Sequence, residues 1–269
     1  MTQSIEGPVL EADDIVVDYH SHGQHKRALD HVSLGIEPGR SIGLIGESGS
    51  GKTTLARALL GLIPPASGTV RYQGKDLYAM GSHRRHRLLG RRASVVFQDP
   101  RSSLNPRLSV GTVIRDPLHV QRIGQRADQT RRVEELLEGV GLPAQLARRP
   151  VRSLSGGQLQ RVALACALAV DPEVIIADEP TSALDVSVQA QILTLLQSIR
   201  QTRSLSLLVV SHDMRVIRLL ADITAVMYNG RIVEVGPTSK VHESPEHPYT
   251  QALLAAAPRL HRKQAALET

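Results

Sequence analysis

The sequence predicts an α/β fold, in which a mainly parallel sheet is joined by an N-terminal antiparallel β subdomain and an inserted α-helical subdomain. Short apolar runs at 41–46, 173–178 and 205–211 are separated by stretches with helical periodicity. Buried strands that alternate with helices are typical of a parallel sheet covered on both faces. A long helical stretch, 99–165, interrupts this alternation and predicts the inserted subdomain.

The N-terminal part of the chain alternates between strand-like and turn-like segments. Residues 9–19 and 28–36 are rich in β-branched side chains, and we expect a hairpin with a polar, histidine-rich loop between them. The apolar run at 41–46 enters a glycine-rich turn, after which residues 52–62 have a helical pattern. Two further strands are expected before the helical insertion, at 67–74 and 93–99.

The rest of the chain first turns helical and then returns to β-type runs. Within 130–140, apolar side chains recur at i, i+3, i+4 and i+7 on one helix face: Val133, Leu136, Leu137 and Val140. Strands are expected at 173–178, 205–211 and 223–235. Between the first two of these runs, an apolar stripe predicts another helix: Val188, Ile192, Leu195, Leu196 and Ile199.

We therefore expect a single domain over 1–269 with three parts. The α/β core with its antiparallel β subdomain takes 1–98 and 166–236, and the helical subdomain takes 99–165. Residues 237–269 are expected to form a short helical tail with a frayed, charged end.

Composition sets limits on the class of protein. The 269 residues are 41% hydrophobic and 22% charged, which is enough for a substantial core. The single cysteine, Cys166, excludes an internal disulfide and a cysteine-ligated metal site, and it fits a reducing compartment. No apolar run has the length of a membrane span and the N-terminus lacks a signal-peptide pattern, so we expect no membrane crossing by this chain itself.

A formal net charge of +6 suits nucleotide, nucleic acid or an anionic membrane surface equally well. Part of this charge lies in residues 81–92, which contain five arginines and two histidines. A nucleic-acid patch is one interpretation, but aromatic residues for base stacking are scarce in the chain. A solvated helix face near acidic lipid, or a basic loop, is the alternative.

The strongest motif is GESGSGKT, from Gly46 to Thr53. Its glycines let backbone N–H groups wrap around phosphates, Lys52 can reach the β- and γ-phosphates, and the Thr53 hydroxyl can ligate Mg²⁺. An ordinary glycine turn is the alternative. The position of the motif between an apolar run and a helical pattern favours a phosphate-binding P-loop.

Acidic residues and a histidine follow two of the predicted buried strands. VIIADEP places Asp178 and Glu179 at the carboxyl end of a strand, where parallel sheets bind their ligands. Asp178 suits the shell of a Mg²⁺ ion, and Glu179 suits polarising a water for attack on the γ-phosphate. His212 follows the run LLVVS and would face the same edge, where a γ-phosphate contact competes with a structural role.

A second phosphate-binding signal is LSGGQLQR, residues 154–161. Ser155, Gly156 and Gly157 lie at a predicted helix start, where free backbone N–H groups and the helix dipole favour an anion. No lysine follows, and the complete P-loop already lies far upstream. The second loop therefore raises the question of which phosphate it serves.

The combination of these motifs resembles the ATP-binding cassette (ABC) ATPases over nearly the whole chain. The P-loop, Gln98 in VVFQDP, LSGGQLQR, VIIADEP, SALD at 182–185 and SHD at 211–213 follow one another in that order. The finer wording of three stretches is similar to the ATPase subunits of oligopeptide, dipeptide and nickel importers: 97–111, 177–193 and 247–258. The resemblance implies a P-loop NTPase (RecA-like) core.

The resemblance also implies roles for individual residues. Tyr19 would stack on adenine, although an ordinary strand tyrosine remains an alternative. Gln98 would sense Mg²⁺ and the attacking water while its loop touches membrane subunits, and Asp185 would couple two nucleotide sites. The catalytic residues implied are Glu179, His212, Gln98 and Lys52, and the Mg²⁺ ligands are Thr53, Gln98 and Asp178. The nucleotide contacts implied are Tyr19, Gly46, Glu47, Ser48, Gly49, Ser50, Gly51, Lys52, Thr53, Thr54, Ser155, Gly156, Gly157, Gln158 and Asp185.

The function implied is that of an ATP-hydrolysing importer subunit with ATP and Mg²⁺ as cofactors. Two cassettes, of the same or of homologous chains, would stack head to tail, so that LSGGQ of one binds the γ-phosphate on the P-loop of the other. Expected partners are two integral membrane permease subunits and an extracytoplasmic solute-binding protein, at the cytoplasmic face of the inner membrane, with no nucleic acid. Peptide uptake is the first hypothesis, and nickel or another small solute is the alternative.

Two rival functions share parts of this pattern. A soluble cassette acting on DNA or ribosomes usually has tandem cassettes or coiled-coil arms, and an export ATPase would share only the core. One feature departs from the family pattern: Cys166 stands where relatives usually carry arginine, which puts in doubt any salt bridge made there.

Overall fold

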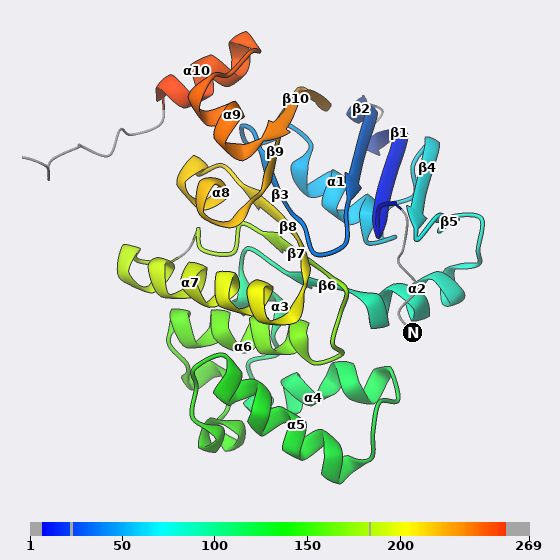
Figure 1. Cartoon of the computed structure of the whole chain (residues 1–269). Helices are drawn as coiled ribbons and strands as arrows, with labels where there is room; N and C mark the ends of the chain where they lie inside the picture. Colours follow the sequence, from blue (N-terminus) through cyan, green and yellow to red (C-terminus); the bar gives the residue numbers. More distant parts are fainter. Residues whose placement is uncertain (1–6, 22–23, 183, 257–269) are drawn as a thin grey trace, which may run out of the picture.

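The chain folds into two sheets with a helical part to one side, as the ribbon in Figure 1 shows. This computed structural model describes residues 7–21, 24–182 and 184–256. The six-stranded sheet has the order β10-β9-β3-β8-β7-β6 and is parallel from β9 to β6, as predicted. Its strands are β3 (Ser41–Ile45), β6 (Ala93–Val96), β7 (Val174–Asp178), β8 (Ser206–Ser211), β9 (Ile223–Tyr228) and β10 (Arg231–Pro237).

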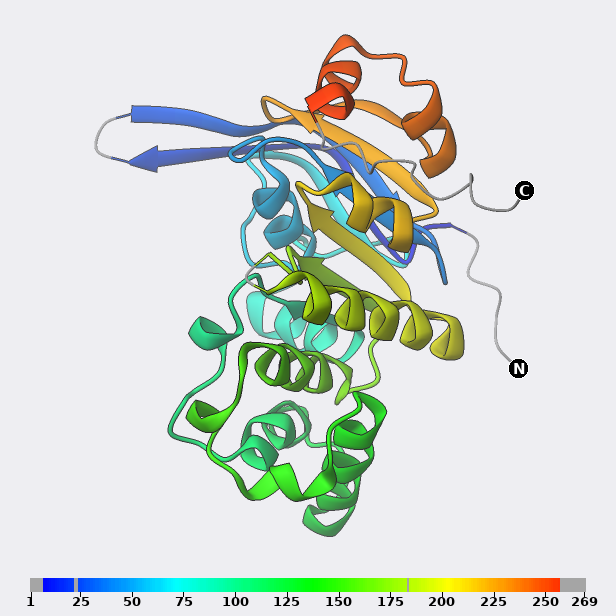
Figure 2. The same ribbon diagram turned by 90° about the vertical axis from the view of Figure 1, so that its left-hand side faces the viewer.

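The second sheet is antiparallel, again as predicted, and its first hairpin is longer than expected. Its order is β2-β1-β4-β5, with β1 (Leu10–Ser21), β2 (Gln24–Ile36), β4 (Ser67–Tyr72) and β5 (Lys75–Asp76). The histidine-rich loop predicted after residue 19 is largely strand, because backbone pairing between β1 and β2 continues to Ser21 and Gln24. The hairpin projects from the molecule as a long arm (Figure 2).

Alternating side chains of the six-stranded sheet pack into two separate cores. Ile42 and Leu44 of β3 face the antiparallel sheet and α1 (Lys52–Leu59), where they join one buried cluster. Ile45 joins the other cluster, together with α7 (Val186–Arg203) and α8 (Met214–Leu220). Both faces of the parallel strands are therefore covered, which explains their almost uniformly apolar sequences.

Helices fill the stretch for which the sequence predicted them. They are α3 (Pro100–Ser103), α4 (Val110–Val120), α5 (Arg126–Gly139), two 3₁₀ turns (Ala144–Arg148 and Val151–Ser153) and α6 (Gly156–Leu168). Cys166 lies on α6, and its thiol donates to the Val113 carbonyl at 3.5 Å. Burial raises the pKa of this thiol to about 12, so Cys166 takes part in packing as a neutral side chain.

A further helix, α2 (Ser82–Arg92), carries the basic segment. The sequence left open whether these residues form a helix face or a loop, and the helix is what the structure shows. It leads directly into β6 at Ala93.

The C-terminal part ends in two strands and two short helices. The run 223–235, predicted as one strand, is a hairpin of β9 and β10, because Asn229 and Gly230 adopt φ angles of 46° and 79° and reverse the chain. It is followed by α9 (Thr238–Glu243) and α10 (Pro248–Ala256). The charged end predicted for the tail lies outside the described residues. Among the described helices, none combines the length and the apolar character that a membrane span requires.

Candidate active site

The GESGSGKT segment forms a tight loop between β3 and α1. A Cβ atom at Gly46 would lie 2.1 Å from the Met227 carbonyl oxygen, so that this position has room only for glycine. Gly51 has a φ of 111°, and a Cβ there would lie 2.6 Å from the Ala28 carbonyl oxygen. The two glycines let the loop run close to neighbouring backbone before α1 begins at Lys52.

Lys52 is the buried cation of this loop. Its ammonium group donates to the carbonyl oxygens of Gly46 at 2.8 Å and Glu47 at 2.7 Å. Only 5% of the residue is exposed. Burial lowers the pKa of Lys52, while the nearby carboxylates of Glu179 and Asp178 oppose this shift. The structure therefore holds a positive charge between the P-loop and the acidic end of β7.

The other predicted loop residues surround this cation. Ser50 is buried, and its backbone N–H donates to the Glu47 carbonyl at 3.2 Å, whereas Glu47, Ser48 and Gly49 are exposed. Thr53 is exposed in the first turn of α1.

Tyr19, predicted to stack on adenine, lies near the start of α1. Its hydroxyl oxygen is 3.4 Å from the Thr54 hydroxyl oxygen, and 39% of the residue is exposed. The aromatic ring is thus held at the start of α1 while part of it remains accessible to a ligand.

Asp178 ends the buried strand β7. Burial raises the pKa of its carboxyl group, and a hydrogen bond with Thr53 acts in the opposite direction. The hydroxyl and the carboxylate are therefore adjacent, and both are oxygen donors that Mg²⁺ prefers. This pair fits a magnesium ion, since Mg²⁺ is usually held by one or two protein oxygens together with substrate phosphates and waters.

Glu179 is held from two sides by predicted site residues. Gln98 donates through Nε2 to one carboxylate oxygen at 2.9 Å, and Nδ1 of His212 lies 2.9 Å from the other. The Glu179 backbone has a φ of 47°, which is unusual for a residue other than glycine, and its N–H donates to the Val210 carbonyl at 2.8 Å. A cavity of about 200 Å³ lies beside Glu179 and His212.

The second glycine-containing loop caps α6. Ser155 accepts from the Gln158 N–H at 3.3 Å, while the Gln158 side chain accepts from the Ser155 N–H at 3.1 Å. This reciprocal capping box fixes the loop at the helix start. A Cβ at Gly157 would lie 2.6 Å from Val188 Cγ1, so glycine lets the loop approach α7 closely.

Asp185 caps the N-terminus of α7 by accepting from the Val188 N–H at 3.0 Å. Its pKa is lowered, first by this backbone hydrogen bond and then by the Ser187 hydroxyl.

The hydrogen bonds that the structure gives for Ser155 and Gln158 stay within their own loop. By contrast, Gln98, Asp178, Glu179 and His212 meet near Lys52 at one edge of the sheet.

A contact from the C-terminal part was missed by sequence reasoning. The backbone N–H of Glu47 donates to the hydroxyl oxygen of Tyr249 at 3.0 Å. The Tyr249 ring also stacks on Tyr228, with 4.2 Å between ring centroids. The stretch 247–258 had marked the resemblance to importer subunits, but nothing in its pattern indicated a contact with the P-loop.

Comparisons with known proteins agree with this geometry. A family model described as "ABC transporter" matches residues 29–182, and one described as "Oligopeptide/dipeptide transporter, C-terminal region" matches residues 233–269. A putative peptide import ATP-binding protein of Brucella abortus is 43% identical over 260 residues, which cover 94% of this chain and 78% of the relative. A putative peptide import ATP-binding protein of Brucella ovis is 42% identical, with 94% and 80% covered.

Solved structures show the same fold. A dimeric ATP-binding cassette in a post-hydrolysis state, bound to ADP and Pi, has a TM-score of 0.78 and 28% identity, covering 85% of this chain and 98% of its own. The cbiO1 protein from Clostridium perfringens, described as part of the ABC transporter complex cbiONQ, has a TM-score of 0.78 and 27% identity, with 89% and 92% covered.

Proposed function

The chain belongs to the ABC transporter family as an ATP-binding, ATP-hydrolysing cassette, and from this premise we propose that it energises peptide import through partner membrane subunits. The names of the curated relatives support peptides as the solute class rather than nickel. The match of residues 233–269 to the oligopeptide and dipeptide C-terminal region supports the same choice.

The observation that carries the proposal is the position of the Glu179 carboxylate. It lies at the end of β7, near Lys52, and is oriented by Gln98 and His212. We assign Glu179 as the general base that takes a proton from the attacking water. A base must be oriented toward one point in space, and two contacts from different segments supply that orientation.

The neighbouring residues would bind and orient the nucleotide. Lys52 would exchange its carbonyl contacts for the β- and γ-phosphates, and the N–H groups of the P-loop would cradle them. Tyr19 would stack on adenine. His212 would contact the γ-phosphate from the neighbouring strand β8.

Thr53 and Asp178 would hold a magnesium ion, with Gln98 as the third protein ligand proposed. When bound, this ion supplies charge neutralisation on the phosphate oxygens. The chain's own part is to hold a hydroxyl and a carboxylate in mutual contact at the sheet edge, which the hydrogen bond between Thr53 and Asp178 achieves.

The second loop would serve the nucleotide of a second cassette, the same chain or a homologous one. Ser155, Gly156 and Gly157 lie on the helical part, at the start of α6, where Gly157 is fixed against α7. The capping box uses the N–H groups of Ser155 and Gln158, and the other N–H groups at the start of α6 would bind an anion, which a γ-phosphate held by another P-loop would supply. ATP would then join the two cassettes, and hydrolysis would separate them. Asp185 would couple the two sites.

The remaining assignments follow from the importer role. We propose one domain with an α/β core (1–98 and 166–236), a helical subdomain (99–165) and a tail (237–269). The turn-rich residues 99–106, which follow Gln98, would dock on two permease subunits at the cytoplasmic face of the inner membrane. An extracytoplasmic binding protein would deliver the peptide.

The test is transport by the assembled complex. The chain is co-expressed with candidate permease and binding-protein genes from its own genome, and uptake of labelled peptide into proteoliposomes is measured with ATP. We expect uptake that Glu179→Gln abolishes. Copurification with nucleic acid and not with membrane subunits would instead favour a soluble cassette, and nickel uptake without peptide uptake would overturn the solute class.

A further inference from the structure

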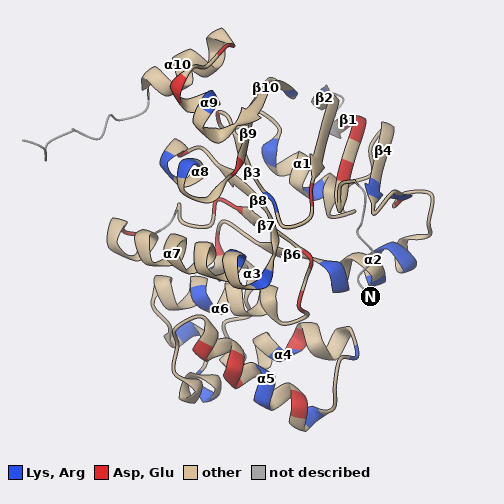
Figure 3. Cartoon of the chain, viewed as in Figure 1, with Lys and Arg blue, Asp and Glu red and all other residues tan. Residues whose placement is uncertain are grey.

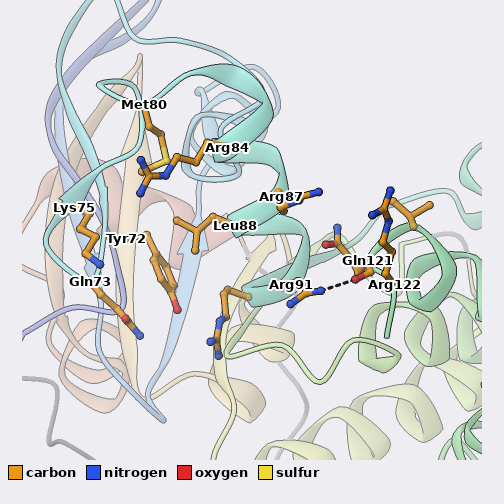
Figure 4. Close-up of a pocket in the computed structure, with 12 residues that line it drawn as sticks. Tyr72, Gln73, Lys75, Met80, Arg84, Arg87, Leu88, Arg91, Gln121 and Arg122 are labelled. Atoms are coloured by element: carbon orange, nitrogen blue, oxygen red, sulfur yellow. Dashed lines mark hydrogen bonds between the residues drawn. The ribbon is translucent and has the colours of Figure 1, made fainter. Parts of the chain in front are cut away.

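Outside the active site lies a basic pocket of about 720 Å³. Its walls are α2, the β4–β5 hairpin and the end of α4 (Figure 4). Six of its lining residues are cationic, and none of its described lining residues is acidic. The cationic residues are Lys75, Arg84, Arg87, Arg91, Arg92 and Arg122.

The spacing of residues on α2 explains why one face of the helix is basic. Arg84, Arg87, Leu88 and Arg91 recur at i, i+3, i+4 and i+7 and all line the pocket. Figure 3 shows how much of the α2 ribbon consists of arginine positions, coloured blue.

The opposite face of α2 is fixed by packing, which keeps the basic face turned toward the pocket. Leu89 is buried, with 4% of the residue exposed. Arg85 donates to the Gly61 carbonyl at 3.2 Å, and its guanidinium lies 4.5 Å from the centre of the Tyr78 ring. The helix therefore cannot roll to disperse its charges without losing these contacts.

Most of the positive charge in the pocket is not neutralised by the protein. Arg92 pairs with Glu173 at 2.6 Å, and Arg91 donates to the Gln121 carbonyl at 2.6 Å. Within the described part of the chain, the other four cations form no salt bridge: Lys75, Arg84, Arg87 and Arg122. A concave surface with several uncompensated charges of one sign attracts counter-ions of the other sign.

The pocket joins two parts of the fold. The Gln121 side chain, just after α4, lies against Gly90 of α2, where an added Cβ would be 2.3 Å from its Nε2. The bond from Arg91 to the Gln121 carbonyl fixes the same junction. A ligand in the pocket would touch Arg84 and Arg87 on one wall and Arg122 on the other (Figure 4).

Apolar side chains complete the lining: Met80, Leu88 and Val120. Val120, at the end of α4, is 65% exposed. The pocket thus combines guanidinium groups, which bind phosphate oxygens in bidentate fashion, with a small apolar surface.

We propose that this basic pocket binds phosphate groups that carry at least two negative charges, in one ligand or in two adjacent ones. Their source is either a soluble polyphosphate or the headgroups of anionic phospholipids such as phosphatidylglycerol, which carry one charge each. Nucleic acid fits less well, because Tyr72 is the only aromatic residue among the described residues of the lining, and its hydroxyl donates to Glu173 at 2.6 Å.

The test for a soluble ligand uses pyrophosphate as the probe. Calorimetry is done on full-length Lys52→Ala protein, so that the P-loop contributes little, and then on the same protein with Arg84→Ala and Arg87→Ala added. We expect binding to weaken about tenfold or more when both arginines are removed. Arg126→Ala, an exposed arginine on α5 outside the pocket, should leave the affinity unchanged.

The test for a lipid source is flotation of the otherwise unaltered chain with vesicles. Phosphatidylcholine vesicles with and without phosphatidylglycerol are compared, again with the Arg84→Ala, Arg87→Ala double variant and the Arg126→Ala control. If vesicle binding needs phosphatidylglycerol and is lost only in the double variant, the ligand is lipid. If only pyrophosphate binding is weakened in the double variant, while vesicle binding is unchanged, the ligand is soluble.

Either pattern supports the site, and three outcomes overturn it. One is that the double variant and the control behave alike with both probes. Another is that neither probe binds the parent protein while circular dichroism shows it folded. The third is that a single-stranded oligonucleotide displaces both probes and loses its own binding in the double variant, which would assign the pocket to nucleic acid.

Discussion

The hydroxyl oxygen of Tyr249 accepts a hydrogen bond from the backbone N–H of Glu47, at 3.0 Å, across 202 residues of sequence. A residue of the C-terminal region thus fixes the first turn of the P-loop. Stacking of Tyr249 on Tyr228 holds the hydroxyl in place.

Tyr249→Phe should weaken ATP binding by several-fold, because it removes one hydrogen bond worth about 1 kcal/mol from a loop that must keep its shape. Nucleotide affinity is measured by calorimetry. Tyr228→Phe is the matched control, since it keeps the ring contact and does not touch the Glu47 amide. Equal affinities for the two variants would show that the hydrogen bond does not support the loop.

Glu179→Gln should bind ATP nearly as well as the unaltered chain but hydrolyse it about 10²- to 10⁴-fold more slowly, because the proton acceptor is lost while the shape is kept. Steady-state phosphate release gives the rate, and size exclusion with ATP and Mg²⁺ should show accumulated dimer. Glu243→Gln, an exposed glutamate on α9, is the control. Two results would contradict the role of Glu179 as general base. One is a Glu179→Gln variant that hydrolyses ATP at the original rate. The other is a variant that forms no dimer while the assembled complex also fails to trap nucleotide.

Two inactive variants should complement one another when they are mixed. Lys52→Ala should lose tight ATP binding, whereas Ser155→Arg should still bind ATP but block closure of the dimer. In the mixed dimer, the altered P-loop faces the altered signature loop, so both lesions fall in one composite site and the other site is intact. We expect nucleotide-driven closure to return, as measured by energy transfer between labelled chains.

The deciding control places one lesion in each site. It pairs a chain that carries both Lys52→Ala and Ser155→Arg with an unaltered chain. If this dimer closes as readily as the dimer with both lesions in one site, Ser155 does not act in trans. Where the natural partner is a homologous cassette, the same pairings are made across the two different chains.

Asp222 should make folding stability depend on acid pH. Burial alone would raise the pKa of its carboxyl group, but hydrogen bonds from Arg200 and Ser41 outweigh burial and lower this pKa below the ordinary 3.8. The ionised carboxylate therefore stabilises the fold fully above pH 3.8, and this contribution is lost as the pH falls through the lower folded-state pKa. Because Asp222 accepts from the Ser41 N–H at 3.0 Å, it joins the starts of β3 and β9.

Asp222→Asn should lower the free energy of unfolding by about 1–3 kcal/mol at neutral pH. The difference from the unaltered protein should shrink as the pH falls below 3.8 and through the lower folded-state pKa. Urea denaturation at a series of pH values measures both quantities. Glu134→Gln, an exposed glutamate of α5, should show no such trend. A constant difference across this range would mean that the carboxylate's charge is not what stabilises the junction.

The P-loop and the strand ends were predictable because their constraints are local. Gly46 and Gly51 must be glycines because neighbouring backbone leaves no room for a side chain, and Asp178 and Glu179 come at the end of a short apolar run that forms the buried strand β7. Since the carboxyl ends of parallel strands share one edge, the meeting of Glu179 with His212 followed from topology.

The parts that sequence reasoning missed depend on distant packing. No local pattern joins Tyr249 to Glu47, and the basic pocket needs residues 120–122 beside α2, which only the tertiary fold provides. The turn at Asn229 and Gly230 is a different case. An Asn-Gly pair between apolar runs is a known hairpin signal. The prediction of a single strand over 223–235 was wrong because it gave this pair no weight.

The left-handed backbone of Glu179 limits which residues that position can hold. With a φ of 47°, the site suits glycine and tolerates asparagine or aspartate, whereas β-branched residues are strongly disfavoured there. Random replacement of this codon should therefore yield two populations. One would be soluble but inactive, with Gln, Asn, Asp or Gly, and the other would be depleted from the folded fraction, with Val, Ile or Thr. At position 179, few replacements can therefore abolish hydrolysis while keeping the architecture, because the backbone conformation excludes most of the others.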